Sequence, residues 1–150
     1  MKDNYDRLVK QKLTRMSSYI DELEPYLQCS VDEYLSSSGR RRVVERLTQV
    51  IVESATDVNN LLTEQAGQAP AMTAPQSFVT VHDLGAINEH LLDRFQRYVG
   101  LRNRIVHDYN VLDNRIVYYS AKRLIDDARK YAESIYRYLS LGSAEGDENK

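Results

Sequence analysis

The sequence has few of the residues that carry redox or metal chemistry, and it lacks long apolar runs. Its 150 residues include one cysteine, Cys29, and no tryptophan. A single cysteine excludes a disulfide within the chain and a cysteine-ligated zinc cluster. Because no apolar run approaches the roughly 20 residues that span a bilayer, we expect no transmembrane helix. The first residues also lack the apolar segment of a signal peptide, so we expect a cytoplasmic protein with no membrane attachment.

An excess of charge of either sign is also missing. The chain carries 20 Lys and Arg residues against 22 Asp and Glu residues, which gives a net charge of −2. Nucleic-acid binding would therefore need a local basic patch. Arginines do gather in two places, within residues 40–46 and 94–104. Arginine on a helix surface is usually solvated charge, so these clusters alone do not predict a function.

The sequence does not contain the spacing of a helical metal site. His82, His90 and His107 are separated by eight and seventeen residues, and metal-binding histidine pairs on helices are four residues apart. There is also no glycine-rich phosphate loop and no dinucleotide-binding fingerprint. We therefore expect no metal and no cofactor, and we interpret Cys29 as a buried or incidental thiol rather than a nucleophile.

Apolar residues recur at three- and four-residue steps along most of the chain, which is typical of amphipathic helices. This pattern predicts four long helices, over residues 4–26, 40–64, 83–109 and 115–139. A short helix is expected after Ser30, because Ser30 followed by Glu33 forms a capping box. Strand alternation and internal repeats are absent. The predicted fold is an all-α, up-and-down bundle of four long helices plus one short helix.

Glycine and proline mark the expected limits of these helices. Residues 67–77 contain two prolines and no periodicity, which predicts a long surface loop whose role the residues do not reveal. Gly85 and Gly100 lie within the third long helix, where glycine is less favourable than alanine. Gly100 fits either a close approach by a ligand or backbone, or packing against a neighbouring helix. Gly142 is a natural helix end, so we expect a helical domain over residues 1–142 and a polar, disordered tail over residues 143–150.

An arginine interrupts the apolar stripe of the third long helix. If the stripe continued past Tyr98, its next apolar residue would be expected at position 102, but this position holds Arg102. An unpaired guanidinium is costly to bury, so a charge at this position requires a reason. The remaining stripe residues are Leu84, Ile87, Leu91, Phe95, Ile105 and Tyr109.

Polar residues around Arg102 suggest a site, although one straight helix does not bring them together. Asn103 and His107 share a face, so the amide could orient the imidazole. Arg102 and His107 lie about 140° apart on the helix. Three explanations are open: the last turn unwinds, the arginine bends round, or two copies of the helix meet across a dimer axis. A structural alternative is an arginine paired to a buried acid and a histidine exposed at a helix end.

The pattern Arg102-x4-His107-x-Tyr109 resembles the signature of the HEPN superfamily of helical ribonucleases. Residues 101–109, Leu-Arg-Asn-Arg-Ile-Val-His-Asp-Tyr, resemble its HepT branch in particular. HepT proteins are toxins of toxin–antitoxin pairs, each encoded beside a minimal nucleotidyltransferase antitoxin, MntA. The predicted helices fall in the order expected for this family over most of the chain.

The resemblance implies a metal-independent endoribonuclease that works as a homodimer, with the motifs of both protomers facing one cleft. His107 would act as general base on a ribose 2′-hydroxyl, or as acid to the leaving oxygen. Arg102 would stabilise charge on the phosphate. Asn103 would orient His107 or contact RNA, and Arg104 and Arg97 would hold the RNA backbone. The expected product is a 2′,3′-cyclic phosphate, and the RNA is either transfer or messenger RNA.

Tyr109 is the motif position at which the antitoxin of this family is understood to transfer AMP, which blocks the RNA cleft. Tyr118 and Tyr119 lie nearby but outside the motif. Two other hypotheses fit the same residues. One is a catalytically inert HEPN module that binds nucleotide or RNA, or docks a nucleotidyltransferase. The other is a plain helical dimerisation module.

Overall fold

The structure, a computed structural model, describes the backbone of residues 2–148 and the side chains of residues 2–142. This part of the chain is helical and contains no strand, which confirms the predicted all-α class. Its elements in chain order are α1 (Lys2–Tyr26), α2 (Val31–Ser36), α3 (Ser38–Gln65), α4 (Ala74–Asp83), α5 (Glu89–His107), the 3₁₀ helix η1 (Tyr109–Val111) and α6 (Asn114–Glu148).

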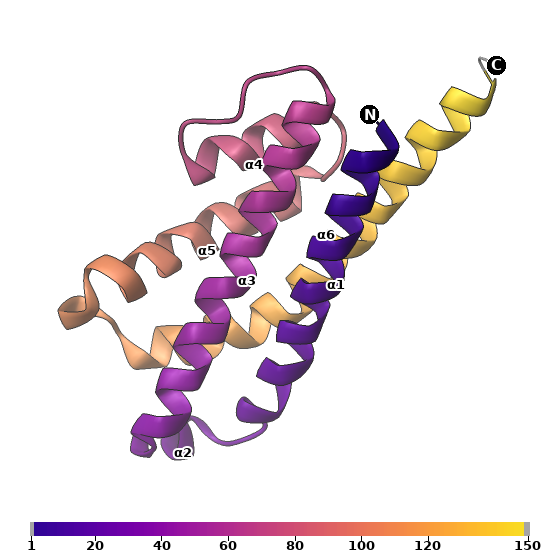
Figure 1. Cartoon of the computed structure of the whole chain (residues 1–150). Coiled ribbons are helices and arrows are strands. Elements are labelled where there is room, and N and C mark those ends of the chain that lie inside the picture. Colours follow the sequence, from indigo (N-terminus) through magenta and orange to yellow (C-terminus); the bar gives the residue numbers. More distant parts are fainter. Residues whose placement is uncertain (1, 149–150) are drawn as a thin grey trace.

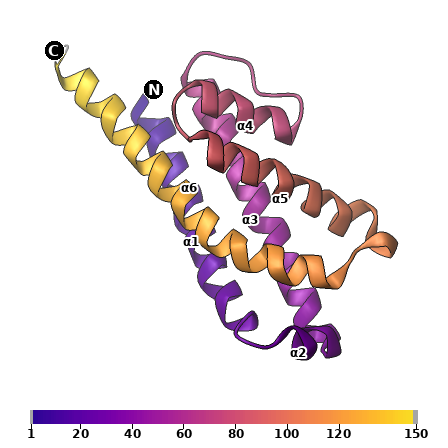
Figure 2. The ribbon, with the colours of Figure 1, turned by 180° about the vertical axis from the view of Figure 1, so that it is seen from behind.

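The helices form a bundle in which α3 contacts every other α-helix (Figure 1). α1 packs chiefly along α3 and α6, and α4 packs against α3 and α5. α5 and α6 form a hairpin joined through η1, as the view from behind also shows (Figure 2). The short helix α4 and both ends of the described chain lie at one end of the bundle, and α2 lies at the other (Figure 1).

Side chains of all six helices meet in one apolar core. The predicted stripes of the first, second and last helices are buried there. Large, fully buried members of this core include Leu13, Met16, Ile51, Phe78, Phe95 and Leu124. Polar bonds are also buried within the core: the Tyr131 hydroxyl donates to the Ala55 carbonyl at 3.0 Å, and the Asn59 amide donates to the Ser77 hydroxyl at 3.1 Å.

The predicted capping signals near residue 30 are confirmed. The Ser30 hydroxyl accepts a hydrogen bond from the Glu33 amide at 3.1 Å and caps α2. Ser37 caps α3 in the same way, by accepting from the Arg40 amide at 3.2 Å. These side chains supply acceptors that the first turn of a helix otherwise lacks. The chain therefore turns sharply from α1 through α2 into α3.

The prediction of one continuous helix over residues 83–109 is wrong. α4 ends at Asp83, and Gly85 adopts φ +87°, a left-handed conformation that glycine accepts without strain. The Ala86 amide donates to the Val81 carbonyl at 2.9 Å and closes the end of α4. α5 then begins after Asn88, whose side chain accepts from the Leu91 amide at 2.9 Å. The apolar stripe continues across this break, because Val81 in α4, Ile87 in the turn and Leu91 in α5 are all buried.

The predicted loop over residues 67–77 is shorter than expected. α4 begins at Ala74, and the Thr73 side chain caps it by accepting from the Gln76 amide at 3.3 Å. Pro75 lies in the first turn of α4, where a helix has no need of its missing amide hydrogen. This proline therefore helps to start a helix instead of marking a loop.

The predicted helix end at Gly142 is also wrong. α6 continues through Gly142 to Glu148. The Gly142 carbonyl accepts a hydrogen bond from the Lys2 ammonium at 2.8 Å, and Gly142 does not adopt a positive φ. A helix tolerates such a glycine at a cost of about 1 kcal/mol. The expected tail over 143–150 thus begins with helical backbone, whereas residues 149–150 and the side chains beyond residue 142 lie outside the described part of the chain.

Candidate active site

The motif residues lie at the end of α5, and this helix stays regular through His107. The Asp108 amide donates to the Arg104 carbonyl at 3.0 Å, after which the chain turns into η1. The explanation in which the last turn unwinds before His107 is therefore wrong. Arg102 and His107 keep the separation of about 140° that an α-helix imposes.

Arg102 does not bend round toward His107 but points to α3. One guanidinium nitrogen, Nη2, donates to Glu53 Oε2 at 2.9 Å, and the other, Nη1, donates to Asn103 Oδ1 at 3.3 Å. The Arg102 side chain is 26% exposed and that of Glu53 is 37% exposed. Gln49 Nε2 also donates to Glu53 Oε2, at 3.3 Å. Glu53 thus holds the charge that appeared misplaced in the sequence.

The other predicted site residues lie on the open side of α5. Asn103, Arg104 and His107 are exposed, and so is Arg97 one turn or more before them. The expected hydrogen bond from Asn103 to His107 is not formed among the described side chains, and the Asn103 oxygen accepts from Arg102. Within one protomer, this geometry matches the structural alternative in part. The histidine is exposed at the helix end and the arginine is paired with an acid, but that acid is partly exposed instead of buried.

A small hollow lies beside the Arg102–Glu53 pair. Its walls come from α3, α5 and the first residue of α4, and they include Arg102, Asn103, Glu53 and Thr56. His107 does not line it. The hollow therefore opens onto the arginine side of the motif only.

Tyr109 lies in η1, and Glu45 on α3 is a buried acid that sequence patterns did not single out. The Tyr109 side chain is 54% exposed, whereas Glu45 on α3 is only 5% exposed. Burial raises the pKa of the Glu45 carboxyl, and the Tyr109 hydroxyl, followed by the charges of Arg41 and Arg42, opposes that rise. Glu45 Oε2 is buried without a hydrogen-bond partner among the described residues. Glu45 is thus a buried acid whose charged form is disfavoured by its surroundings.

Glu45 and Glu53 belong to one polar row on α3. The members of this row recur at four-residue steps and are Arg41, Glu45, Gln49 and Glu53. The eight residues from Glu45 to Glu53 rise about 12 Å along the helix. The four-residue repeat of charged and amide side chains along α3 was the signal that could have revealed this row from the sequence.

Apolar side chains are exposed around the motif. Val106, Tyr109, Val111, Ile116 and Tyr119 are between 39% and 71% exposed, and we call these five residues the hairpin patch. All five lie on the last turn of α5, on η1 or on the first turns of α6. Clustered apolar exposure of this kind is typical of a protein–protein contact surface.

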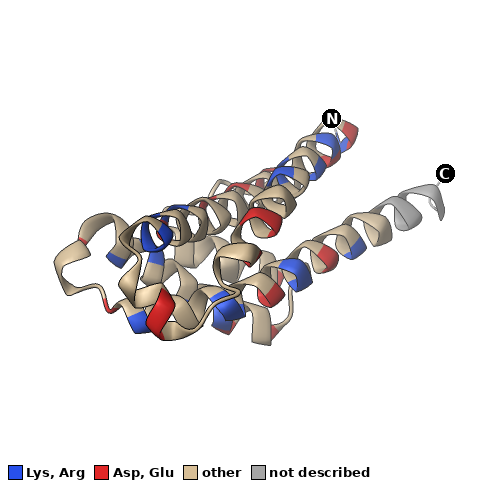
Figure 3. Ribbon diagram, turned by 90° about the horizontal axis from the view of Figure 1, so that it is seen from below, with Lys and Arg blue, Asp and Glu red and all other residues tan. Residues whose placement is uncertain are grey.

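The arginines of residues 40–46 have two different environments. Arg40 donates to the Tyr26 carbonyl at 3.0 Å, and Arg41 donates to the Leu35 carbonyl, so both bind the ends of helices that precede them. Such cations complement the partial negative charge of a helix C-terminus. Arg42 and Arg46 are exposed. Positive and negative residues are otherwise interspersed along the helices (Figure 3).

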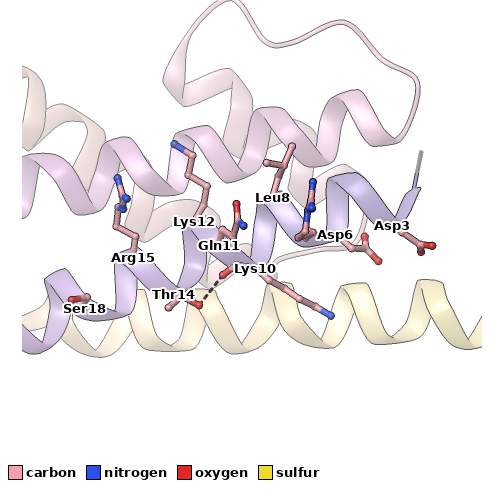
Figure 4. A pocket seen from close by; sticks show the side chains of 10 residues that line it. Asp3, Asp6, Leu8, Lys10, Gln11, Lys12, Thr14, Arg15 and Ser18 are labelled. Carbon is pink, nitrogen blue, oxygen red and sulfur yellow. Dashed lines mark hydrogen bonds between the residues drawn. The ribbon is translucent and has the colours of Figure 1, made fainter.

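Other candidate features lie elsewhere. One surface hollow runs along the first half of α1, and all the residues that line it, Asp6, Lys10 and Arg15 among them, belong to that helix (Figure 4). Cys29 is half-buried, and its thiol donates to the Tyr26 carbonyl at 3.7 Å. No group of three potential metal ligands is found among the described residues. None of the described helices is long and apolar enough to cross a membrane.

An all-helical bundle with an arginine and a histidine in the last turns of its fifth helix, and a tyrosine directly after that helix, is the architecture of a HEPN-type protein. The family model for HepT-like ribonucleases matches residues 16–135, so the chain belongs to the HepT-like ribonuclease family. This confirms the family that the motif suggested.

Individual relatives agree with this assignment. The chain is 26% identical over 140 residues to the tRNA nuclease HepT of Aphanizomenon flos-aquae. This match covers 93% of this chain and 95% of the relative. It is 28% identical over 83 residues to the mRNA nuclease HepT of Shewanella oneidensis, covering 55% of this chain and 62% of the relative. Its fold is similar to that of the tri-AMPylated Shewanella oneidensis HEPN toxin in complex with its MNT antitoxin, with a TM-score of 0.79, 21% identity and coverage of 86% and 96%.

Proposed function

We propose that this chain is the toxin of a toxin–antitoxin pair and that it cleaves RNA without a metal ion. The observation that carries the proposal is the Arg102, His107 and Tyr109 motif, displayed at the end of α5 in a member of the HepT-like ribonuclease family. Two relatives are named a tRNA nuclease and an mRNA nuclease, so RNA is the substrate class and either kind of RNA is compatible with the family. Cleavage would take place in the cytoplasm.

The chemistry follows from the two side chains. His107 is exposed and takes the proton of a ribose 2′-hydroxyl, whose oxygen then attacks the neighbouring phosphorus. Arg102 stabilises the negative charge that builds on the phosphate oxygens. The bond to the 5′-oxygen breaks, a proton is returned to that oxygen, and a 2′,3′-cyclic phosphate remains. Asn103, Arg104 and Arg97, all exposed on α5, hold the RNA backbone.

A homodimer would solve the geometric problem of the motif. Arg102 and His107 of one protomer point in different directions, since Arg102 contacts Glu53 on α3. Packing the hairpin patch of one protomer against that of another would bury its exposed apolar side chains. It would also bring the two copies of the motif to one cleft, so that His107 of one protomer and Arg102 of its partner act on the same phosphate.

Regulation would act through Tyr109. Its side chain is 54% exposed and is therefore accessible to a modifying enzyme. A solved structure similar to this one is named as a tri-AMPylated toxin with its antitoxin. We propose that a cognate MntA-like nucleotidyltransferase transfers AMP to Tyr109. The added bulk and negative charge at the cleft would then exclude RNA.

Expression of the wild type without its antitoxin tests this proposal, with growth and cellular RNA followed over time. We expect growth arrest and RNA breakage. His107→Ala and Arg102→Ala should each abolish both effects, while Arg129→Ala, a control on the α1–α6 side, should retain them. Intact RNA with the wild type would reject the nuclease, and cleavage by both folded motif variants would reject the site.

A catalytically inert module is the second candidate. The observation that favours it is the Arg102–Glu53 ion pair, which occupies the guanidinium that catalysis requires. An inert module would bind RNA or the nucleotidyltransferase and leave RNA intact. The expression experiment separates the two candidates, because only the ribonuclease breaks RNA.

A further inference from the structure

A groove lies between the end of α1 and the first turns of α3, two helices that run side by side (Figure 1). Its volume is about 600 Å³, which is large enough for a nucleoside. The residues that line it are Glu22 and Tyr26 of α1 and Arg42, Val43, Arg46 and Leu47 of α3. None of them belongs to the motif or to the hairpin patch, so the groove is a separate feature of the surface.

Arg42 and Arg46 bring two unpaired positive charges to this groove. Both are exposed, and neither forms a hydrogen bond or an ion pair among the described residues. Arg40 and Arg41 differ from them, because each donates to a backbone carbonyl. Arg42 and Arg46 are four residues apart, so they share a face of α3 and lie about 6 Å apart along its axis. Successive phosphates of an extended single strand have a similar spacing, so the pair can contact two neighbouring phosphates.

Tyr26 provides an aromatic ring on the opposite wall of the groove. It is 40% exposed, and its backbone carbonyl accepts a hydrogen bond from Arg40 at 3.0 Å, which ties the end of α1 to the start of α3. An exposed aromatic ring beside positive charges suits a single-stranded nucleic acid, whose bases stack on the ring while cations bind its phosphates. Glu22, one turn earlier on α1, repels a phosphate but can accept a hydrogen bond from the amino group of a base.

The solvent-facing side of α3 connects this groove to the motif. Its residues Arg42, Arg46, Gln49 and Glu53 follow one another at steps of three or four, and each is exposed or partly exposed. Glu53 is the partner of Arg102. Arg46 lies seven residues before Glu53, about 10 Å along the helix, and a few nucleotides span such a distance. An RNA strand bound at Arg102 can therefore reach the groove.

We propose that this groove is a subsite for single-stranded RNA, a few nucleotides away from the bond that is cleaved. Arg42 and Arg46 bind two phosphates of the strand, and one base stacks on Tyr26. The inference rests on the proposed function, in which RNA is the substrate, and it adds a contact with RNA outside the motif. Such a subsite increases the affinity for RNA without touching the reacting phosphate.

Equilibrium binding of a fluorescent single-stranded decanucleotide RNA tests this assignment. The parent protein is the full chain carrying His107→Ala, so that the RNA stays intact. Adding Arg42→Ala together with Arg46→Ala should raise the Kd at least tenfold. The slope of log affinity against log salt should become shallower by about 1.4, because two phosphate contacts on a single strand are lost. Lys130→Ala together with Arg137→Ala removes two exposed cations of α6 and should change neither quantity.

Substitutions of Tyr26 separate stacking from charge. Tyr26→Ala in the parent should raise the Kd by at least about fivefold and leave the salt slope unchanged, because a stacked base is lost but no phosphate contact. Tyr26→Phe keeps the ring and should bind as the parent does. A photoreactive thiouridine in the RNA should crosslink to the peptide that contains Tyr26. Thermal melting confirms that each variant is folded.

The inference and the proposed function fail in different ways. If the parent binds no RNA and the wild type cleaves none, the proposed function is wrong and the subsite falls with it. If the parent binds RNA and the variant without both arginines binds it equally well, with the same salt slope, the subsite alone is overturned. If that variant binds RNA normally but no longer forms a complex with the cognate antitoxin, the groove is a protein-docking surface and the inference is equally wrong.

Discussion

At the scale of the residue, the proposed role of Arg102 in catalysis depends on how strongly Arg102 is bound to Glu53. The two side chains are partly exposed, so solvent screens their attraction and the pair contributes little to stability. Arg102 can therefore exchange its carboxylate partner for a phosphate. The motif itself was predictable, because it is a local pattern. Glu53 was not singled out, because its partner Arg102 lies 49 positions away. Glu45 was not singled out either, because its burial depends on the fold.

The weakness of this pair predicts that Arg102→Ala separates activity from stability. We expect its free energy of unfolding to change by no more than about 1 kcal/mol. Urea unfolding measures this change. A loss of several kcal/mol would show instead that Arg102 is a structural residue, as the alternative interpretation holds.

Glu45 predicts a pH dependence of stability. Because its pKa is raised in the folded protein, the native state binds more protons than the unfolded state between the ordinary and the raised pKa. The contribution of Glu45 to stability therefore falls as pH rises through that window. Glu45→Gln should unfold at a higher urea concentration than the wild type at pH 7, and the difference should shrink toward pH 4. Equal midpoints at pH 7 would contradict this assignment.

At the scale of the element, capping residues and glycines decide where helices end. The apolar stripe predicted the long helices because it reports burial. It could not locate the break at Gly85, because α4 and α5 bury one continuous stripe and the periodicity hardly changes across the turn. The break depends on the positive φ of Gly85. The sequence alone does not distinguish this glycine from Gly100, which is helical.

These two glycines predict opposite effects of alanine. Gly85→Ala should destabilise the fold by about 1 kcal/mol, because φ is +87° there and a Cβ atom is strained in that conformation. Gly100→Ala should stabilise it by about 0.5–1 kcal/mol, because Gly100 lies within α5 and a Cβ atom there meets nothing within 4 Å. Thermal melting of both variants checks the signs. A stabilised Gly85→Ala would contradict the described turn.

At the scale of the whole molecule, the fold places a polar motif and an apolar patch at the same end of a hairpin. Most apolar side chains are buried in the core of the bundle. The hairpin patch, next to the motif, stays exposed in a single protomer. Sequence periodicity suggested a shared site but could not show which surface is exposed, since exposure depends on all the helices together.

The hairpin patch predicts that one charge breaks the homodimer. Val111→Asp, at a residue 71% exposed, should fold but run as a monomer, because a dimer would bury the new carboxylate. Met72→Asp, at a residue 97% exposed and outside the patch, is the matched control and should remain dimeric. Light scattering after size exclusion gives the mass. A dimeric Val111→Asp protein would place the interface elsewhere.

Cleavage of a defined RNA by purified protein in the presence of a metal chelator tests the proposed metal-independent ribonuclease most directly. This proposal predicts that the wild type leaves 2′,3′-cyclic phosphate ends and that His107→Ala and Arg102→Ala leave the RNA intact. It also predicts that mixing the two inactive variants restores part of the activity, since a mixed dimer retains one intact His107 and one intact Arg102 facing each other across the cleft. RNA left whole by the wild type, or cleaved equally by a folded His107→Ala protein, would contradict it.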